Sequence, residues 1–205
     1  MLTLSKYEAK TKEDAYEKCS NEHNLEEMFI KEQELQGGIF KSKKYILEVI
    51  GKNEVKNYIK DYISNIDKSF KIDIKSEVNE KDNIIKVNLI SNNNPILIGK
   101  DGKTVESLQT LIKNSIKNST GLDIKINVDV SDYKAKKEKH FEKEIKNIIK
   151  DILKTHIDVK LDPMNSYKRR IVHNLVSNYK ELKTESVGQE PKRYTIIKYV
   201  GEEDR

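Results

Sequence analysis

A tight turn rich in glycine is the first feature of the sequence that could bind a ligand. Gly99 and Gly102 flank Lys100 and Asp101, and Lys103 follows directly. Glycine lets the backbone pass close to another chain, and a helix N-terminus behind such a turn attracts phosphate groups. The two lysines add positive charge. This pattern predicts contact with the phosphate backbone of a nucleic acid, although any tight turn between two helices could carry the same glycines.

The residues before this turn argue against nucleotide hydrolysis. A phosphate-binding loop of the Walker A type needs a glycine five residues before its Gly-Lys-Thr triplet. The triplet here is residues 102–104, and the required position holds Leu97. The preceding segment also reads as a short helix after Pro95 and not as a buried strand. The phosphate-binding loop of a nucleoside triphosphatase is therefore excluded.

A second candidate site lies on a predicted helix near the C-terminus. Arg169 and His173 are four residues apart and share one helix face, and Arg170 lies within the same arc of roughly 100°. Arginine can meet a phosphate with its planar fork or stack on a base. All four arginines lie in this part of the chain, since Arg193 and Arg205 follow. We expect a cationic ridge that faces solvent and binds a polyanion; a solvated polar face is the alternative.

Residue types and spacing argue against catalysis and against a bound metal or cofactor. His173 has no acidic residue three or four positions away, and Ser186 lacks the Gly-x-Ser-x-Gly pattern of a nucleophile elbow. Cys19 is the single cysteine of the sequence, which rules out an internal disulfide. The histidines are too scattered for a zinc cluster: His23, His140, His156 and His173. We expect a protein that is not an enzyme and holds no metal or cofactor.

Charge and composition indicate a polar protein with a basic C-terminal part. The 205 residues contain 39 basic and 34 acidic side chains, a net charge of +5. Residues 1–50 carry a net charge of −2, residues 51–130 carry +2 and residues 131–205 carry +5, which favours a polyanion-binding C-terminal part. No apolar run approaches the roughly 18–20 residues that span a bilayer, and residues 1–10 lack the apolar core of a signal peptide. We therefore expect a cytoplasmic protein that is not an integral membrane protein.

The elements that position these residues predict an α+β fold of three small domains, residues 1–50, 51–130 and 131–205. The first is expected to be a β-α-β-β unit: a strand near residues 2–4, a helix opened by Thr11, strands at 26–35 and 45–50, and a turn at Gly37 and Gly38. The second is expected to follow the order α-β-β-α-α-β: helix 55–66, strands 70–78 and 85–89, helices 96–98 and 103–117, and strand 122–130. The third is expected to place helices on a small antiparallel sheet: helices 133–156 and 163–179, then strands 183–187 and 194–199.

The position of the glycine turn within this order of elements points to a particular kind of domain. Helix, Gly-x-x-Gly turn and helix inside residues 54–130 resemble a type II KH domain, whose loop clamps about four nucleotides of a single strand. The resemblance implies RNA contacts from the loop: Gly99, Lys100, Asp101, Gly102 and Lys103. Four apolar residues would line the groove beside it, although at least half of them are expected to be ordinary core: Ile96, Leu97, Ile98 and Val105.

The C-terminal segment resembles the small domain family named for an arginine and a histidine with three residues between them, which is associated with single-stranded nucleic acid. The resemblance rests on Arg169 and His173, on the sequence Thr-Glu-Ser-Val-Gly-Gln-Glu-Pro at residues 184–191, and on Arg193. It implies that Arg169 contacts a phosphate or stacks on a base, and that His173 hydrogen-bonds a phosphate or a base edge. Arg170 and Arg193 belong to the same predicted surface.

A β-α-β-β unit followed by these two domains resembles the Jag/KhpB family over nearly the full chain. The resemblance implies a sporulation-associated RNA-binding regulator of cell elongation and division, with single-stranded RNA as its partner. It also implies a small KH-only partner protein and an association with a membrane insertase of the YidC/SpoIIIJ type. Two alternatives stay open: an adaptor that binds an insertase or division protein through residues 1–50, and a single-stranded DNA binder, which differs in its 2′-hydroxyl contacts.

Overall fold

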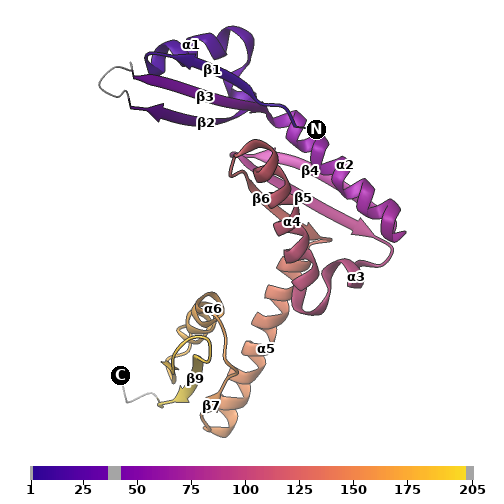
Figure 1. Cartoon of the computed structure of the whole chain (residues 1–205). Helices are drawn as coiled ribbons and strands as arrows, with labels where there is room; N and C mark the ends of the chain where they lie inside the picture. Colours follow the sequence, from indigo (N-terminus) through magenta and orange to yellow (C-terminus); the bar gives the residue numbers. More distant parts are fainter. Residues whose placement is uncertain (1, 37–42, 202–205) are drawn as a thin grey trace. The chain divides into compact units, whose positions relative to one another are not determined.

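The computed structural model describes residues 2–36 and 43–201, which form two compact units, Met1–Tyr133 and Lys134–Arg205 (Figure 1). The predicted α+β class is confirmed, because the described residues combine small three-stranded sheets with helices packed on them. The domain boundaries at residues 50 and 130 stay a prediction.

The first unit opens with an antiparallel sheet covered by one helix. Its elements are β1 (Ser5–Ala9), α1 (Lys12–Glu22), a 3-10 turn (Leu25–Glu27), β2 (Met28–Leu35) and β3 (Lys44–Gly51), with β3 in the middle of the sheet. As predicted, the Thr11 hydroxyl caps α1 by accepting a hydrogen bond from the Asp14 amide at 3.2 Å. Ala15 and Cys19 face the sheet and are fully buried. The β-α-β-β order is confirmed, whereas the predicted turn at Gly37 and Gly38 lies outside the described residues.

The first strand exists as predicted but is displaced along the chain: β1 begins at Ser5, and Leu2 and Leu4 lie before it. Leu2 is only 7% exposed and packs into the core of the following α-β-β-α-α-β segment, together with Phe29 and Ile50. Leu4 packs against the same core. A buried leucine outside a strand gives the same apolar signal as one inside it.

The second part of the first unit has the predicted α-β-β-α-α-β order. Its elements are α2 (Lys52–Phe70), β4 (Ile74–Lys81), β5 (Ile84–Ser91), α3 (Asn94–Ile98), a 3-10 turn (Lys100–Gly102), α4 (Lys103–Thr120) and β6 (Lys125–Val130). The central strand β5 pairs antiparallel with β4 and parallel with β6. The buried stripes of α2 and α4, including Ile59 and Ile112, form one core with Val87 and Val128 of the sheet.

The prediction that a strand begins at Phe70 is wrong. Phe70 is the last residue of α2 and is 70% exposed. Lys71 follows as the C-cap of the helix and has a left-handed backbone (φ 55°). Glycine is the usual residue at such a helix end. Because lysine stands there instead, the end of α2 carries no signal that sequence patterns could detect.

The second unit packs two helices on a small antiparallel sheet. Its elements are α5 (Tyr133–Thr155), β7 (Val159–Lys160), α6 (Ser166–Val176), β8 (Leu182–Val187) and β9 (Tyr194–Tyr199). Helix α5 starts at the last residue of the first unit. Strand β9 lies between β7 and β8 in the sheet. Ile145, Ile149 and Val172 lie in its core. The helix predicted from residue 163 begins at Ser166, because the Asn165 side chain accepts a hydrogen bond from the Lys168 amide at 3.0 Å and caps it there. The short strand β7 was not predicted.

Candidate nucleic-acid interface

The glycine turn joins α3 to α4 through backbone conformations that favour glycine. Gly99 has φ 69° and ψ −177°, a region that is essentially restricted to glycine. Gly102 has φ 89° and serves as the N-cap of α4. Between them Asp101 takes a left-handed conformation, with φ 57°. The chain therefore passes from α3 to α4 within four residues.

The surroundings of both glycines leave no room for a side chain. A Cβ atom at Gly99 would lie 2.8 Å from the Cβ of Thr104, and one at Gly102 would lie 2.9 Å from Cε1 of Tyr133. Real Cβ atoms essentially never come this close to other heavy atoms. Both glycines are thus required by the fold of the turn itself, before any ligand is considered.

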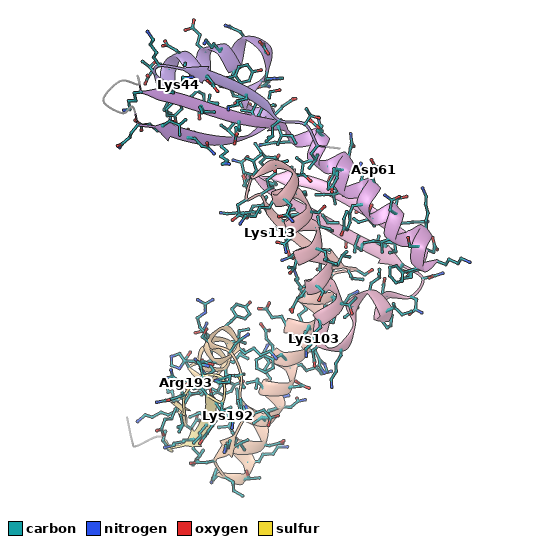
Figure 2. All side chains as sticks on the ribbon, viewed as in Figure 1. Lys44, Asp61, Lys103, Lys113, Lys192 and Arg193 are labelled. Carbon is teal, nitrogen blue, oxygen red and sulfur yellow. The ribbon has the colours of Figure 1, made fainter. Side chains whose placement is uncertain are left out.

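The start of α4 offers positive charge and an N-terminus without a side-chain cap. No side chain caps the N-terminus of α4 in the described part of the chain. Lys100 and Lys103 are exposed on either side of Gly102, and Figure 2 labels Lys103 at this end of the helix. Helix N-termini with backbone N–H groups and nearby cations bind anions readily. The turn is therefore suited to hold a phosphate group.

The four apolar residues beside the turn divide as expected between core and surface. Leu97 is 4% exposed and Val105 is 1% exposed, and both belong to the core. Ile96 is 52% exposed, while Ile98 is half-buried against the core. Two of the four residues thus leave apolar surface next to the turn where a base could pack.

The second predicted site lies on α6, where Arg170 and His173 are exposed. The His173 Nδ1 atom lies 2.8 Å from the Thr184 hydroxyl of β8, within hydrogen-bond distance. The Arg170 guanidinium lies 5.7 Å from the ring centroid of Tyr167, a cation–π contact. The two exposed side chains leave a positive and a titratable group at the surface of this helix.

Arg169 does not lie on an open ridge, contrary to the expectation from the helix pattern. Its side chain is only 10% exposed. Arg169 Nη1 donates hydrogen bonds to the Glu190 carboxylate and to the Met164 carbonyl, both at 2.7 Å. A helical projection counts only residues of the same helix, and the carboxylate that covers Arg169 comes from the loop between β8 and β9. The predicted role of Arg169 in binding stays a prediction.

Arg193 connects this loop to the start of α6. Its backbone carbonyl accepts a hydrogen bond from the Met164 amide at 3.0 Å. Its Nε atom is buried and has no hydrogen-bond partner within the part of the chain that the structure describes. Figure 2 labels Arg193 beside Lys192 in the second unit. An unpaired buried donor costs free energy, so a ligand acceptor within reach of this group would stabilise it.

Sequence reasoning did not identify the side chains that hold this surface together. Thr184 and Glu190 contact His173 and Arg169, respectively, and both lie within residues 184–191. That segment contributed only to a family resemblance. The only sign of these contacts in the sequence is that polar residues follow a cationic helix. Such a pattern does not predict which polar residue contacts which residue of the helix.

The described residues offer neither a metal cluster nor a membrane span. In residues 2–36 and 43–201, no group of three or more His, Cys, Asp or Glu side chains is placed to hold a metal ion. None of the helices in these residues combines the length and apolar character that a bilayer span requires.

Two domain families match the parts of the chain that carry these sites. The KhpA/KhpB KH-domain family matches residues 56–130, and the domain family named for the Arg-x-x-x-His motif matches residues 139–199. KH domains bind nucleic acids through their Gly-x-x-Gly loop. The chain therefore falls in the class of modular proteins built from nucleic-acid-binding domains.

Comparison with curated proteins narrows this class to one family. A protein of Clostridium symbiosum is 36% identical over 126 residues, which cover 62% of this chain and 57% of that relative. A protein of Bacillus subtilis (strain 168) is 26% identical over 164 residues, 79% of each chain, and one of Streptococcus pneumoniae serotype 2 is 26% identical over 149 residues, 70% of this chain and 43% of the relative. All three are named RNA-binding protein KhpB. The chain belongs to the Jag/KhpB family, and it spans little more than half the length of the first of these relatives.

Proposed function

We propose that the chain is a non-catalytic protein that binds single-stranded RNA. The observation that carries this proposal is the turn at residues 99–102, whose two glycines are required by its backbone and whose flanking lysines are exposed. The names of the family relatives support RNA as the ligand.

The turn binds the strand through its backbone phosphates. A phosphate bound at the start of α4 meets the N-terminus of that helix and the ammonium groups of Lys100 and Lys103. Gly99 and Gly102 give the turn its positive-φ backbone, which places Lys100 and Lys103 on either side of Gly102. Exposed Ile96 provides an apolar contact for a neighbouring base. This mode holds the backbone firmly and reads the bases weakly.

The exposed face of α6 provides a second contact surface. Arg170 can stack on a base or contact a phosphate, and His173 can hydrogen-bond either group. Two weak sites on one chain gain affinity because binding at the first raises the effective concentration of the strand at the second. Each site alone is therefore expected to bind poorly.

The direct test replaces one lysine of the turn by an acidic residue. Lys100→Asp introduces a carboxylate at the position proposed to contact a phosphate, and like charges repel. We expect the affinity of the full chain for a single-stranded RNA oligomer to fall at least about tenfold, measured by fluorescence anisotropy at low salt. Because Lys100 is exposed, the melting temperature should stay within about 1–2 °C of the wild-type value.

Lys60→Asp is the matched control. Lys60 is exposed on α2 and undergoes the same charge change. The control should lower the affinity far less than Lys100→Asp. Equal losses in the two variants would assign the effect to net charge, and wild-type affinity in Lys100→Asp would refute the turn as the site.

Three finer assignments stay predictions of the family resemblance. These are the regulation of cell elongation and division, the small KH-only partner protein, and the association with a YidC/SpoIIIJ-type membrane insertase. The choice between RNA and single-stranded DNA is tested by titrating RNA and DNA oligomers of matched sequence, with tighter RNA binding expected if 2′-hydroxyl groups are contacted.

A further inference from the structure

Helix α5 carries a row of lysines along one side. Five of its eight lysines recur at intervals of three or four residues, and all five are exposed: Lys139, Lys143, Lys146, Lys150 and Lys154. At about 100° per residue they fall within an arc of about 80°, and they extend about 22 Å along the helix axis. We call these five residues the lysine stripe.

The ammonium groups of the lysine stripe are not paired with carboxylates in the described residues, and Glu142, four residues before Lys146, is the acidic residue of α5 nearest to the arc. None of the five ammonium groups forms an ion pair or hydrogen bond with any residue in the described part of the chain. The acidic residues of α5 all project outside the arc of the stripe, and two of them contact other partners: Glu144 pairs with His140, and Glu138 accepts a hydrogen bond from Tyr167. Like charges at these spacings destabilise a helix, so the row carries an electrostatic cost that a bound polyanion would remove.

The stripe lies on a different side of α5 from the core of the second unit. Ile145, Ile149 and Ile152 are at most 2% exposed and pack against α6 and the sheet. The centre of the stripe lies about 130° around the helix from the centre of this buried face. The stripe therefore faces away from the buried side of α5, and its residues belong to α5 whereas Arg170 and His173 belong to α6.

We propose that the lysine stripe is an additional binding surface for the phosphate backbone of a nucleic-acid strand, independent of base sequence. This inference rests on the proposed function in taking nucleic acid as the ligand. Lysine is a flexible point charge without the planar fork of arginine, which suits a row of phosphates better than base edges. The row arrangement matches a linear polyanion, whose counterions are released when lysines replace them.

A membrane surface fits the stripe less well than a nucleic acid does. Helices that bind a bilayer surface insert an apolar face beside their basic one. On α5 the apolar face is the buried face of Ile145, Ile149 and Ile152, which is occupied by the core of its own domain. Only the charged side of the helix is left for an external ligand.

The test replaces three stripe residues in the full chain, Lys143→Gln, Lys146→Gln and Lys150→Gln together. RNA binding is measured by anisotropy with a single-stranded uridine oligomer over a series of salt concentrations. Each lysine that contacts a phosphate of a single strand contributes about 0.7 to the slope of log affinity against log salt. We expect the magnitude of the slope to fall by about 2, and the low-salt affinity to fall at least about threefold.

The matched control removes the same charge elsewhere. Lys60→Gln, Lys68→Gln and Lys75→Gln together change three exposed lysines of α2 and β4, and this variant should keep the wild-type slope. If wild type binds RNA and the stripe variant keeps its slope, the stripe inference is overturned while the proposed function stands. If wild type binds no RNA at any salt concentration, both are overturned. The stripe variant could also keep the wild-type slope of RNA affinity against salt and yet lose binding to phosphatidylcholine–phosphatidylserine vesicles. That result would overturn the assignment of the stripe to nucleic acid in favour of a membrane.

Discussion

Arg169 Nη1 and Glu190 Oε1 lie 2.7 Å apart, which ties α6 to the loop between β8 and β9. The same nitrogen donates to the Met164 carbonyl. A long side chain that would otherwise sample many rotamers is thus held in one place at 10% exposure. Glu190 itself remains 58% exposed. The carboxylate therefore orients the guanidinium and reaches solvent at the edge of the predicted binding surface.

Replacing Glu190 tests this orienting role. If Glu190 positions Arg169, Glu190→Ala should lower RNA affinity by about three- to tenfold, since charge-assisted hydrogen bonds contribute about 1.5–3 kcal/mol and exposure reduces this value. Glu190→Gln keeps an acceptor oxygen and should stay within about twofold of wild type. Fluorescence anisotropy with single-stranded RNA measures both. Tighter binding by both variants would mean that Glu190 competes with phosphate instead of positioning the arginine.

Gly99→Ala separates the folding role of the turn from its binding role. Gly99 occupies a backbone region that costs other residues about 1–3 kcal/mol, and the added methyl group would crowd Thr104. We expect a thermal scan to show a clear drop in the melting temperature of Gly99→Ala, whereas the melting temperature of Lys100→Asp should stay close to that of wild type. Gly51→Ala is the control, because its Cβ would meet no atom closer than 3.9 Å. Equal melting temperatures for Gly99→Ala and wild type would contradict the geometry of the turn.

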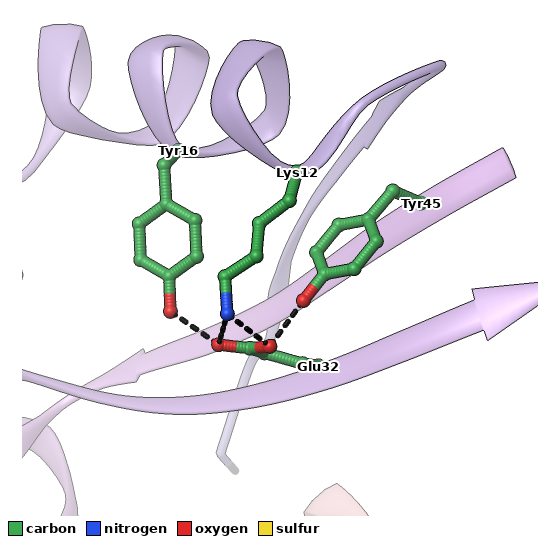
Figure 3. A network of polar contacts seen from close by, with 4 residues as sticks. All are labelled: Lys12, Tyr16, Glu32 and Tyr45. Carbon is green, nitrogen blue, oxygen red and sulfur yellow. Dashed lines mark hydrogen bonds and ion pairs between the residues drawn. The ribbon is translucent and has the colours of Figure 1, made fainter.

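Glu32 makes the N-terminal sheet sensitive to acid. Its carboxylate accepts hydrogen bonds from Lys12 on α1, from Tyr16 on α1 and from Tyr45 on β3 (Figure 3). These donors, Lys12 first, lower the pKa of Glu32 from 4.5 to about 2. A lowered pKa in the folded state contributes stability above the unfolded value of 4.5, and this contribution is lost as the pH falls from 4.5 through about 2. The carboxylate is 38% exposed, so solvent screening keeps the effect small.

Glu32→Gln should therefore flatten the acid side of the stability profile. We expect the melting temperature of wild type to fall more steeply than that of the variant between pH 4.5 and about 2. Glu26→Gln, an exposed carboxylate on the preceding turn, is the control and should follow wild type. Parallel profiles for Glu32→Gln and wild type would show that the network contributes nothing to folding.

Tyr16 should give the same region a dependence on alkaline pH. Burial and the hydrogen bond to Glu32 raise the pKa of Tyr16 from 10.0 to about 12. A raised pKa contributes stability below the unfolded value, and this contribution is lost as the pH rises from 10.0 through about 12. Tyr16→Phe removes the ionisable group, so its melting temperature should decline less than that of wild type over this range. A steeper decline in the variant would contradict the assignment.

Phe29 anchors the N-terminal sheet in the core that also carries the glycine turn. It is 7% exposed and packs with Leu2 and Ile50 against the residues of α2 and the second sheet. Phe29→Ala should cost about 3–5 kcal/mol in the free energy of unfolding of the first unit, measured by urea denaturation. Leu35→Ala, on the same strand but 51% exposed, should change it by no more than about 0.5 kcal/mol. Similar losses in both variants would refute the anchor.

This shared core also determines how the adaptor alternative must be tested. Deleting residues 1–50 would remove Leu2, Phe29 and Ile50 from a core that the remaining domain needs. A lost cellular phenotype could then reflect damage to the domain that is proposed to bind RNA. Substitutions of exposed residues on α1, such as Glu17→Lys, probe a partner surface without opening the core.

Element order was predictable from sequence because apolar periodicity reports burial directly. The stripes of α2 and α4 and the alternation of β6 predicted the α-β-β-α-α-β order correctly. The predicted ends of helices were wrong where a capping residue, and not the apolar pattern, sets the end of the helix. Asn165 caps α6 beyond the proline that suggested its start, and Lys71 ends α2 without a glycine.

Only those features of the candidate sites that depend on neighbouring residues in the sequence could be predicted. Gly99 and Gly102 lie in a single turn, so their spacing was sufficient to locate it. The cover of Arg169 depends on Glu190, 21 residues further along the chain, and the crowding of Gly102 depends on Tyr133. Contacts of this kind arise from tertiary packing, and neither periodicity nor spacing reports them.

Photo-crosslinking of the full chain to a uridine-rich single-stranded RNA, with mass-spectrometric mapping of the attached peptides, is the most decisive experiment for the proposed RNA contacts. We predict crosslinks within residues 96–107, around the glycine turn, and within residues 164–193, around α6 and the loop of Glu190. Crosslinks confined to α2 and β4, with none in residues 96–107, would contradict this prediction.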